Sequence, residues 1–248
     1  MLNIELNKVK LKNGKDILGT ISSVIHPNCI FSIVGKNGAG KTTFIKSLTQ
    51  LLDDKHYSVE GRVVYRGKDI LSMNKKELSY LRKDQIKYVF QDAINSFDPL
   101  KTFKFYFNKL AKDEVDIDKL LDYFLLPRKK ELFKVYPYEV SGGMAQRINF
   151  ALALSAEPEI IILDEPTSGI DSAIANLFIE KMRDFVQFGN NAIILVTHDL
   201  SFARKVSTSI AFLANGSLTD FLKPEEFFVS SGNPELHSIL DSYGQLIS

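Results

Sequence analysis

The sequence predicts an α/β protein with a mostly parallel sheet, and three observations lead to that class. Short apolar runs, typical of strands buried on both faces, recur along the chain. Stretches with helical spacing of apolar residues separate these runs. One segment lacks any such run, which predicts a helical subdomain inserted into the α/β core. The predicted buried strands are residues 29–35, 86–90, 159–164, 192–197 and 209–214.

The elements follow in chain order. A period-two pattern at residues 4–11, followed by the turn sequence KNGK, predicts N-terminal antiparallel β elements. Helical spacing appears in TTFIKSLTQLL, IDKLLDYFLL, MAQRINFALALSA and AIANLFIEKMRDFVQF. We therefore expect a single domain over residues 1–248. Its core covers about 1–91 and 157–248, and its helical subdomain covers about 92–156.

Composition narrows the possible functions. Lys+Arg is 31 and Asp+Glu is 30, so a net charge of +1 provides no general attraction to nucleic acid or anionic lipid. Cys29 is the single cysteine and lies in an apolar run, which predicts a buried, inert thiol. No stretch approaches the ~18 apolar residues that cross a bilayer. A role at a membrane would thus need another chain.

A glycine-rich segment, GKNGAGKTT, matches the phosphate-loop pattern G-x-x-x-x-G-K-[ST]. It lies between a predicted strand and a predicted helix, where its backbone N–H groups would surround phosphates. We expect Lys41 to reach the β- and γ-phosphates, Thr42 to ligate Mg²⁺ and Thr43 to bond a phosphate oxygen. The alternative is an ordinary glycine turn. The predicted phosphate site, in a phosphate-loop NTPase core, comprises Gly35, Lys36, Asn37, Gly38, Ala39, Gly40, Lys41, Thr42 and Thr43.

Polar residues follow three of the predicted buried strands. Asp164 is the expected partner of the metal, through water, and Glu165 is the expected general base. His198 would position water and sense the γ-phosphate, while Gln91 would bond Mg²⁺ or the attacking water. A helix cap or solvated turn for the acids, and a structural role for the histidine, are the alternatives. The remaining histidines are expected to be surface or structural residues: His26, His56 and His237.

A second glycine motif, EVSGGMAQRI, has the form of a helix N-terminus that holds an anion. A phosphate loop leaves the outer face of the γ-phosphate bare, and many such enzymes cover it with an arginine. The sequence offers no obvious arginine for this role. Ser141, Gly142 and Gly143 would be a neutral substitute. An N-cap at Ser141 is the alternative, but it does not explain two glycines.

In order and spacing, these motifs resemble those of the ATP-binding cassette ATPases over nearly the whole chain. Gln91 follows Lys41 by about fifty residues, and Ser141 follows Gln91 by about fifty. Asp164 comes about twenty-three residues later, and SGID ends at Asp171. The resemblance implies ATP and Mg²⁺ as cofactors. It also implies a head-to-tail dimer, in which the serine-glycine-glycine motif contacts ATP held by the other cassette and Asp171 lines the seam.

Two details resemble the peptide/nickel (oligopeptide/dipeptide) importer branch: Met144 in SGGM, and FQDAINSFDPL. That branch implies an ATP-hydrolysing subunit that powers import of peptides or nickel/metal chelates. The implied partners are two membrane permease subunits, a second ATPase (a paralogue rather than an identical copy) and an extracellular or periplasmic binding protein, with no nucleic acid. The implied location is peripheral, on the cytoplasmic face of the cell membrane. Alternatives are an exporter ATPase and a soluble non-transport ATPase.

Other features depart from this family pattern. The aromatic residue that usually stacks on adenine would fall near Lys12 and Asn13, and neither of these is aromatic. Ala93 replaces the proline that is usual in the branch. Segment 93–107 contains five aromatic residues. The segment would receive a coupling helix of the membrane subunits, or its aromatics would form the core of the helical insertion; the two alternatives stay open. The final stretch NPELHSILDSYGQLIS has no cysteines, so no iron–sulfur cluster is expected. The five aromatics are Phe97, Phe103, Phe105, Tyr106 and Phe107.

Overall fold

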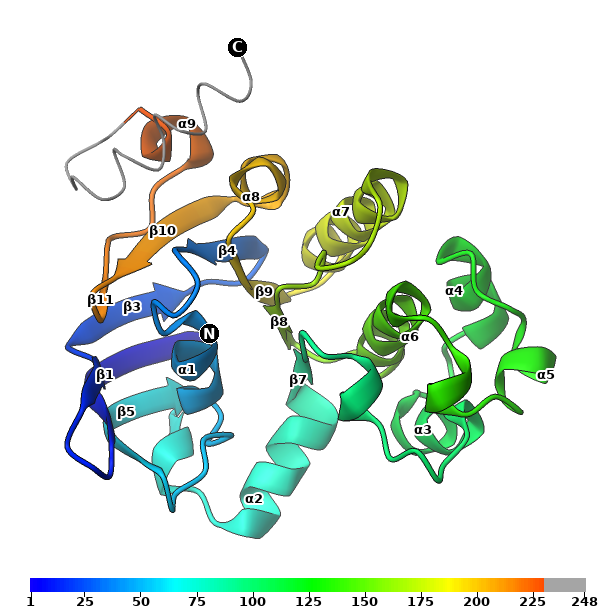
Figure 1. Cartoon of the computed structure of the whole chain (residues 1–248), viewed down its shortest axis with the longest axis horizontal. Helices are drawn as coiled ribbons and strands as arrows, with labels where there is room; N and C mark the ends of the chain where they lie inside the picture. Colours follow the sequence, from blue (N-terminus) through cyan, green and yellow to red (C-terminus); the bar gives the residue numbers. More distant parts are fainter. Residues whose placement is uncertain (230–248) are drawn as a thin grey trace. The chain divides into compact units, whose positions relative to one another are not determined.

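The computed structural model describes residues 1–229 and divides the chain into two compact units (Figure 1). The first unit comprises Met1–Leu78 and Ile194–Ser248, and the second is Ser79–Ile193. The C-terminal stretch for which no iron–sulfur cluster was expected, together with His237, lies outside the described residues. The predicted helical subdomain, 92–156, falls within the second unit, and its limits remain a proposal.

An antiparallel sheet occupies the N-terminal part of the first unit. Its central strand alternates buried and exposed side chains, with Leu2, Ile4 and Leu6 all buried, as the period-two pattern predicts. This strand pairs antiparallel with three others, and the predicted N-terminal antiparallel elements are confirmed. The strands are β1 (Leu2–Leu11), β2 (Asp16–Leu18), β3 (Ile21–Ile25), β5 (Tyr57–Tyr65) and β6 (Lys68–Asp69).

The same unit contains parallel strands in which every residue after the first is buried. β4 (Cys29–Val34) pairs in parallel with β10 (Ser209–Ala214). Their apolar side chains pack with Phe227 in one core cluster. This arrangement matters for function because the glycine loop begins where β4 ends. The other elements of the unit are β11 (Ser217–Leu218), α1 (Lys41–Ser47), η1 (Ile70–Ser72), α8 (Leu200–Val206), α9 (Pro224–Phe227) and most of β9 (Ala192–Thr197), whose first two residues belong to the second unit.

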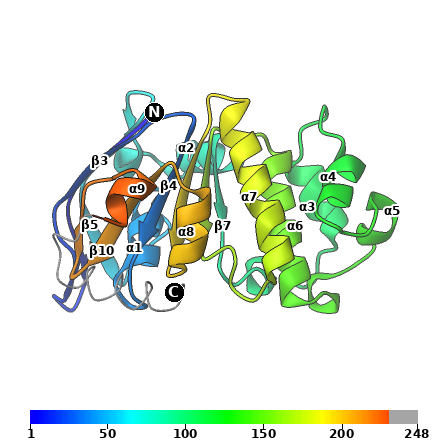
Figure 2. The ribbon, with the colours of Figure 1, turned by 90° about the horizontal axis from the view of Figure 1, so that it is seen from above.

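The second unit combines two parallel strands with most of the helices. β7 (Ile86–Val89) pairs in parallel with β8 (Ile160–Asp164). Figure 2 shows α6 (Gly142–Ser155) beside α7 (Ser172–Gln187), where the rings of Phe150 and Phe178 lie 4.9 Å apart. The other elements are η2 (Leu81–Gln85), η3 (Ile94–Ser96), α3 (Phe103–Leu110), α4 (Ile117–Tyr123), α5 (Lys129–Leu132), η4 (Pro137–Glu139) and the last two residues of α2 (Lys75–Tyr80).

Three details correct or refine the predictions. The helix predicted from TTFIKSLTQLL is only α1, because Leu48 caps it and Gln50 adopts a left-handed φ of 53°. Cys29 is half-buried rather than buried, since it is the first residue of its strand. In segment 93–107 three aromatics are buried, as the core alternative predicts, and the coupling-helix alternative stays a prediction. Phe105 is 42% exposed and Tyr106 half-buried, whereas the other three aromatics are buried.

Within residues 1–229, no helix has both the length and the apolar character that a bilayer span requires.

Candidate functional site

The glycine loop of the first unit joins the end of β4 to the start of α1. A Cβ atom placed on Gly35 would lie 2.4 Å from the backbone oxygen of Leu213, so only glycine fits. Gly40 has a left-handed φ of 99°, and its Cβ would lie 3.1 Å from Leu18. Steric contact and backbone conformation therefore both require glycine in the loop.

Lys41 places a cation against this loop. Its side chain is only 6% exposed, and Nζ donates to the carbonyl oxygens of Gly35, at 2.8 Å, and Lys36, at 3.3 Å. A buried ammonium is costly unless it is paired. The two carbonyl oxygens offset part of the cost of burying this ammonium, and they hold it beside the loop.

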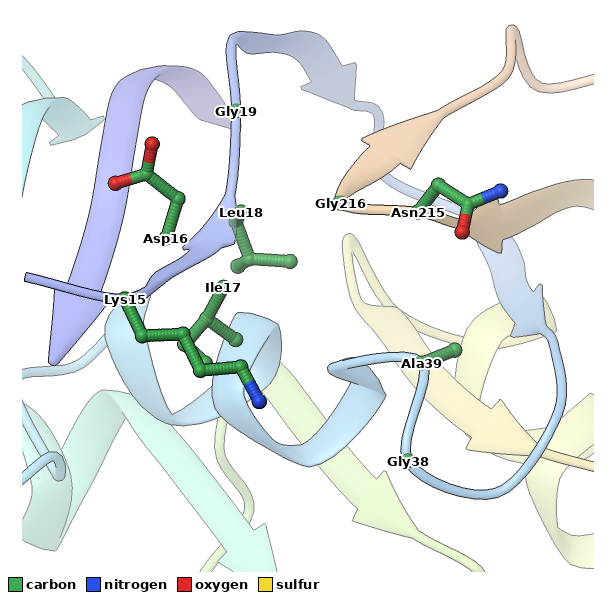
Figure 3. A pocket seen from close by; sticks show the side chains of 9 residues that line it. All are labelled: Lys15, Asp16, Ile17, Leu18, Gly19, Gly38, Ala39, Asn215 and Gly216. Atoms are coloured by element: carbon green, nitrogen blue, oxygen red, sulfur yellow. The ribbon is translucent and has the colours of Figure 1, made fainter.

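A pocket of about 550 Å³ lies beside the loop (Figure 3). Three separate segments surround it: residues 15–19, the glycine loop, and the turn after β10. Its volume lies within the usual range for small-molecule sites. None of its lining residues is aromatic. They are Lys15, Asp16, Ile17, Leu18, Gly19, Gly38, Ala39, Asn215 and Gly216.

Sequence reasoning missed part of this pocket. Asn215 and Gly216 come from a turn remote in sequence, and only the fold brings them to the loop. The backbone N–H of Gly19 donates to the oxygen of Gly216 at 2.8 Å, which joins the turn to segment 15–19. Period-two alternation could have marked Leu18, which is fully buried, but no local pattern marks the turn.

His198, also in the first unit, follows β9 and is exposed. The residues on both sides of it are held by hydrogen bonds. The N–H of Asp199 donates to Oγ1 of Thr197 at 3.0 Å, and Oδ1 of Asp199 accepts from the N–H of Phe202 at 2.9 Å. The second bond caps α8. His198 thus occupies a well-defined backbone position between a strand and a helix.

The acidic pair lies at the end of β8 in the second unit. Asp164 is 3% exposed and Glu165 is 6% exposed. The hydroxyl of Tyr88 donates to Oδ2 of Asp164 at 2.9 Å. Burial of the phenol raises the pKa of Tyr88, and the charge of Asp164 raises it further. The hydroxyl therefore keeps its proton and acts as a donor.

Glu165 has an unusual backbone for a glutamate, with φ 48°. A left-handed conformation at a non-glycine residue costs roughly 1–3 kcal/mol and concentrates at functional sites. Gln91 follows the neighbouring strand, β7. Val89 lies opposite Leu163 in the parallel register, so the two segments leave their strands at the same level. Gln91 itself is exposed. The structure thus places Gln91, Asp164 and Glu165 at the carboxyl ends of two neighbouring parallel strands.

The serine-glycine-glycine motif begins α6. Ser141 is the N-cap, and its Oγ accepts from the N–H of Met144 at 3.3 Å, so the capping role is real. Gly142 is exposed, and a Cβ there would meet nothing within 4 Å. At Gly143 a Cβ would make an ordinary contact, 3.5 Å, with Ile170 of the SGID segment. Neither glycine is required by the packing of this unit.

Arg147 was missed by sequence reasoning, and it supports the motif from within α6. Its Nη1 donates to the carbonyl oxygens of Phe124, at 3.0 Å, and Leu125, at 2.9 Å, while Nε donates to Gly143 at 3.3 Å. Burial lowers the pKa of Arg147, and the nearby Asp171 carboxylate opposes that shift. Its position one helical turn after Gly143 is the signal that could have identified it.

Comparison with known proteins places this arrangement in a class. The family model described as "ABC transporter" matches residues 18–168. In structure, the chain is similar to the ATP-binding cassette MJ0796, solved as a dimer bound to ADP and Pi. The TM-score is 0.76 at 24% identity, over 90% of this chain and 99% of that one. The fold is therefore that of an ATP-binding cassette.

Curated relatives agree. The oligopeptide transport ATP-binding protein AmiE of Streptococcus pneumoniae is 30% identical over 229 residues, or 88% of this chain and 64% of AmiE. The dipeptide transport ATP-binding protein DppD of Bacillus subtilis is 31% identical over 228 residues, or 87% of this chain and 68% of DppD. The chain thus spans somewhat less than two thirds of AmiE's length. It belongs to the ABC transporter family and carries that family's ATPase cassette.

Proposed function

We propose that this chain binds ATP with Mg²⁺ and hydrolyses it as the motor subunit of a solute importer. The observation that supports this best is the buried acidic pair at the end of an entirely apolar strand, with Glu165 in a left-handed conformation. Strained backbone of this kind concentrates at functional sites. With the glycine loop and Lys41, these carboxylates supply the kinds of group that nucleotide hydrolysis uses.

Each residue has a separate role. The loop N–H groups and Lys41 hold the phosphates, Glu165 orients the attacking water and accepts its proton, and His198 contacts the γ-phosphate. Mg²⁺ prefers oxygen ligands, and the residues proposed to supply them are Asp164, Thr42 and Gln91. Residues 1–229 contain no cluster of three or more His, Cys, Asp or Glu side chains able to hold a metal. Mg²⁺ keeps several waters and uses substrate phosphates, and when bound it would neutralise charge on the phosphates.

The site is proposed to be completed by a second cassette. Ser141 and Gly142 are exposed at the start of α6, and the space beside Gly142 would admit a phosphate held by another subunit. Asp171, exposed at the N-cap of α7, would line the same seam. The dimeric state in the name of the MJ0796 structure supports this arrangement.

The decisive experiment replaces Glu165 with glutamine, which keeps the shape of the side chain and removes its basicity. Turnover should fall by at least about a hundredfold, the lower range for a general base. ATP binding should persist, and ATP should now hold a dimer detectable by light scattering. Asp113→Asn, at an exposed position in the second unit, serves as a charge-matched control and should hydrolyse ATP normally. Near-normal turnover of Glu165→Gln would remove this residue from the role of base.

Peptide or metal-chelate import is the finer part of the proposal. The names of AmiE and DppD support peptides as cargo. Segment 93–107 offers a docking surface for membrane subunits: Leu100 is 81% exposed, and Lys101 lies over the ring of Phe105. The chain would then act peripherally at the cytoplasmic membrane face, paired with a paralogous ATPase and fed by an external binding protein.

Affinity purification from membranes tests these partners. We expect the tagged chain to recover two permease subunits, a second ATPase and, through them, a binding protein. Leu100→Asp should reduce this recovery while leaving ATP binding intact. Recovery of permeases without any associated binding protein would favour export. Recovery of ribosomes or DNA in place of permeases would contradict the transport assignment.

A further inference from the structure

Tyr88 and Asp164 are brought together by the register of two parallel strands. Tyr88 in β7 lies opposite Ile162 in β8. Ile162 and Asp164 are two residues apart, so their side chains lie on one face of the sheet. Strands rise about 3.3 Å per residue, so Asp164 lies roughly 6.6 Å further toward the carboxyl end. A tyrosine ring leaning along its strand spans that distance, whereas a serine or threonine would not.

The contact is specific as well as close. The hydroxyl of Tyr88 reaches one carboxylate oxygen, Oδ2 of Asp164, at 2.9 Å. The ring is half-buried and packs on Phe90, with centroids 4.4 Å apart, so its orientation is constrained from the side. A bond from a constrained donor to one oxygen limits rotation of the carboxylate about its Cβ–Cγ bond.

We propose that Tyr88 is a positioning residue, which orients the Asp164 carboxylate toward the magnesium of the bound nucleotide. This inference deepens the proposed function and rests on it. Asp164 acts on the metal, through water, and Tyr88 acts only through Asp164. Mg²⁺ demands near-ideal octahedral geometry, so the direction of a water-bridging carboxylate matters more for it than for a less exacting cation.

The test removes the hydroxyl and nothing else. Tyr88→Phe keeps the ring and its packing on Phe90. Binding of a fluorescent ATP analogue (MANT-ATP) is measured over a Mg²⁺ titration and again in EDTA, using the full chain. We expect the Mg²⁺ concentration at half-saturation to rise about tenfold, since outer-shell partners of metal ligands typically contribute 10–100-fold to metal affinity. Affinity for the analogue in EDTA should not change. A merely structural defect would instead lower the affinity both with Mg²⁺ and in EDTA.

Tyr123→Phe is the matched control. The Tyr123 hydroxyl also donates to a carboxylate, Oε2 of Glu180 at 3.1 Å, but it does so between α4 and α7. This variant should keep the wild-type Mg²⁺ dependence. If Tyr88→Phe does not fold, Tyr88→Met fills a similar volume without a hydroxyl and should show the same rise.

The outcomes separate two kinds of failure. Unchanged Mg²⁺ half-saturation in a folded Tyr88 variant overturns the positioning role, as does an equal rise in Tyr123→Phe. A wild-type chain that binds the analogue with no dependence on Mg²⁺ contradicts the proposed function itself. A rise confined to position 88 supports both.

Discussion

The two glycine-containing motifs of this chain both lie at the start of a helix, but they differ in what requires their glycines. In the phosphate loop, a Cβ on Gly35 would lie 2.4 Å from Leu213 O. At the start of α6, a Cβ on Gly142 would meet nothing within 4 Å. The first motif is therefore constrained by its own fold. Gly142 has no such internal constraint, which leaves room for the proposed contact with a nucleotide held by a second cassette.

The largest expected effect comes from Gly35→Ala. The added methyl would overlap a backbone carbonyl that cannot move alone, which should cost about 3 kcal/mol of unfolding free energy, at the upper end for overpacking. Thermal or urea unfolding measures this loss, and MANT-ATP binding should fall with it. Wild-type stability would show that the loop tolerates a side chain and would remove the contrast between the motifs.

Gly142→Ala should behave in the opposite way. Stability should stay within about 0.5 kcal/mol of wild type or rise, because alanine favours the helix and the site is open. Turnover should fall about a hundredfold, since in the proposed dimer a methyl at this exposed helix start would displace the phosphate of the second cassette. Parallel unfolding and ATPase assays test this pair of outcomes. A stable, fully active variant would leave Gly142 without a role.

Arg147→Ala should have an intermediate effect on stability. Three backbone carbonyls would lose their donor, which should cost about 1–3 kcal/mol. Arg147→Lys keeps the charge but cannot reproduce the planar, several-donor geometry, so it should recover only part of that loss. Urea unfolding ranks the three proteins. Equal stability of all three would mean that these bonds do not support the start of α6.

Lys15→Tyr should have the smallest effect, and it acts on the loop side of the comparison. An aromatic ring in the pocket wall would provide the base stacking that the lining lacks. ATP affinity should improve by about 0.5–1.5 kcal/mol, the range for aromatic pairs. Competition of ATP and GTP against MANT-ATP measures the change. Lys46→Tyr, in α1 and outside the pocket lining, should leave affinity unchanged.

Much of the fold was predictable because buried strands and amphipathic helices leave local patterns. The N-terminal antiparallel elements, the strands that end at Val34 and Asp164, and the long helices α6 and α7 all follow from periodicity of two or 3.6 residues. The phosphate loop and the second glycine motif follow from residue type and spacing. Their roles in catalysis remain proposals.

Other features depend on contacts between residues far apart in the chain. The hydrogen bond from Tyr88 to Asp164 spans 76 positions, and no local pattern records it. No local pattern marks Asn215 as part of the pocket wall either, or predicts the hydrogen bond from Arg147 to the carbonyl oxygen of Phe124. The sequence by itself determined the elements and the chemical groups, because periodicity and motif spacing are local properties. Only the tertiary structure decided which groups meet, because strand register and packing act across the whole chain.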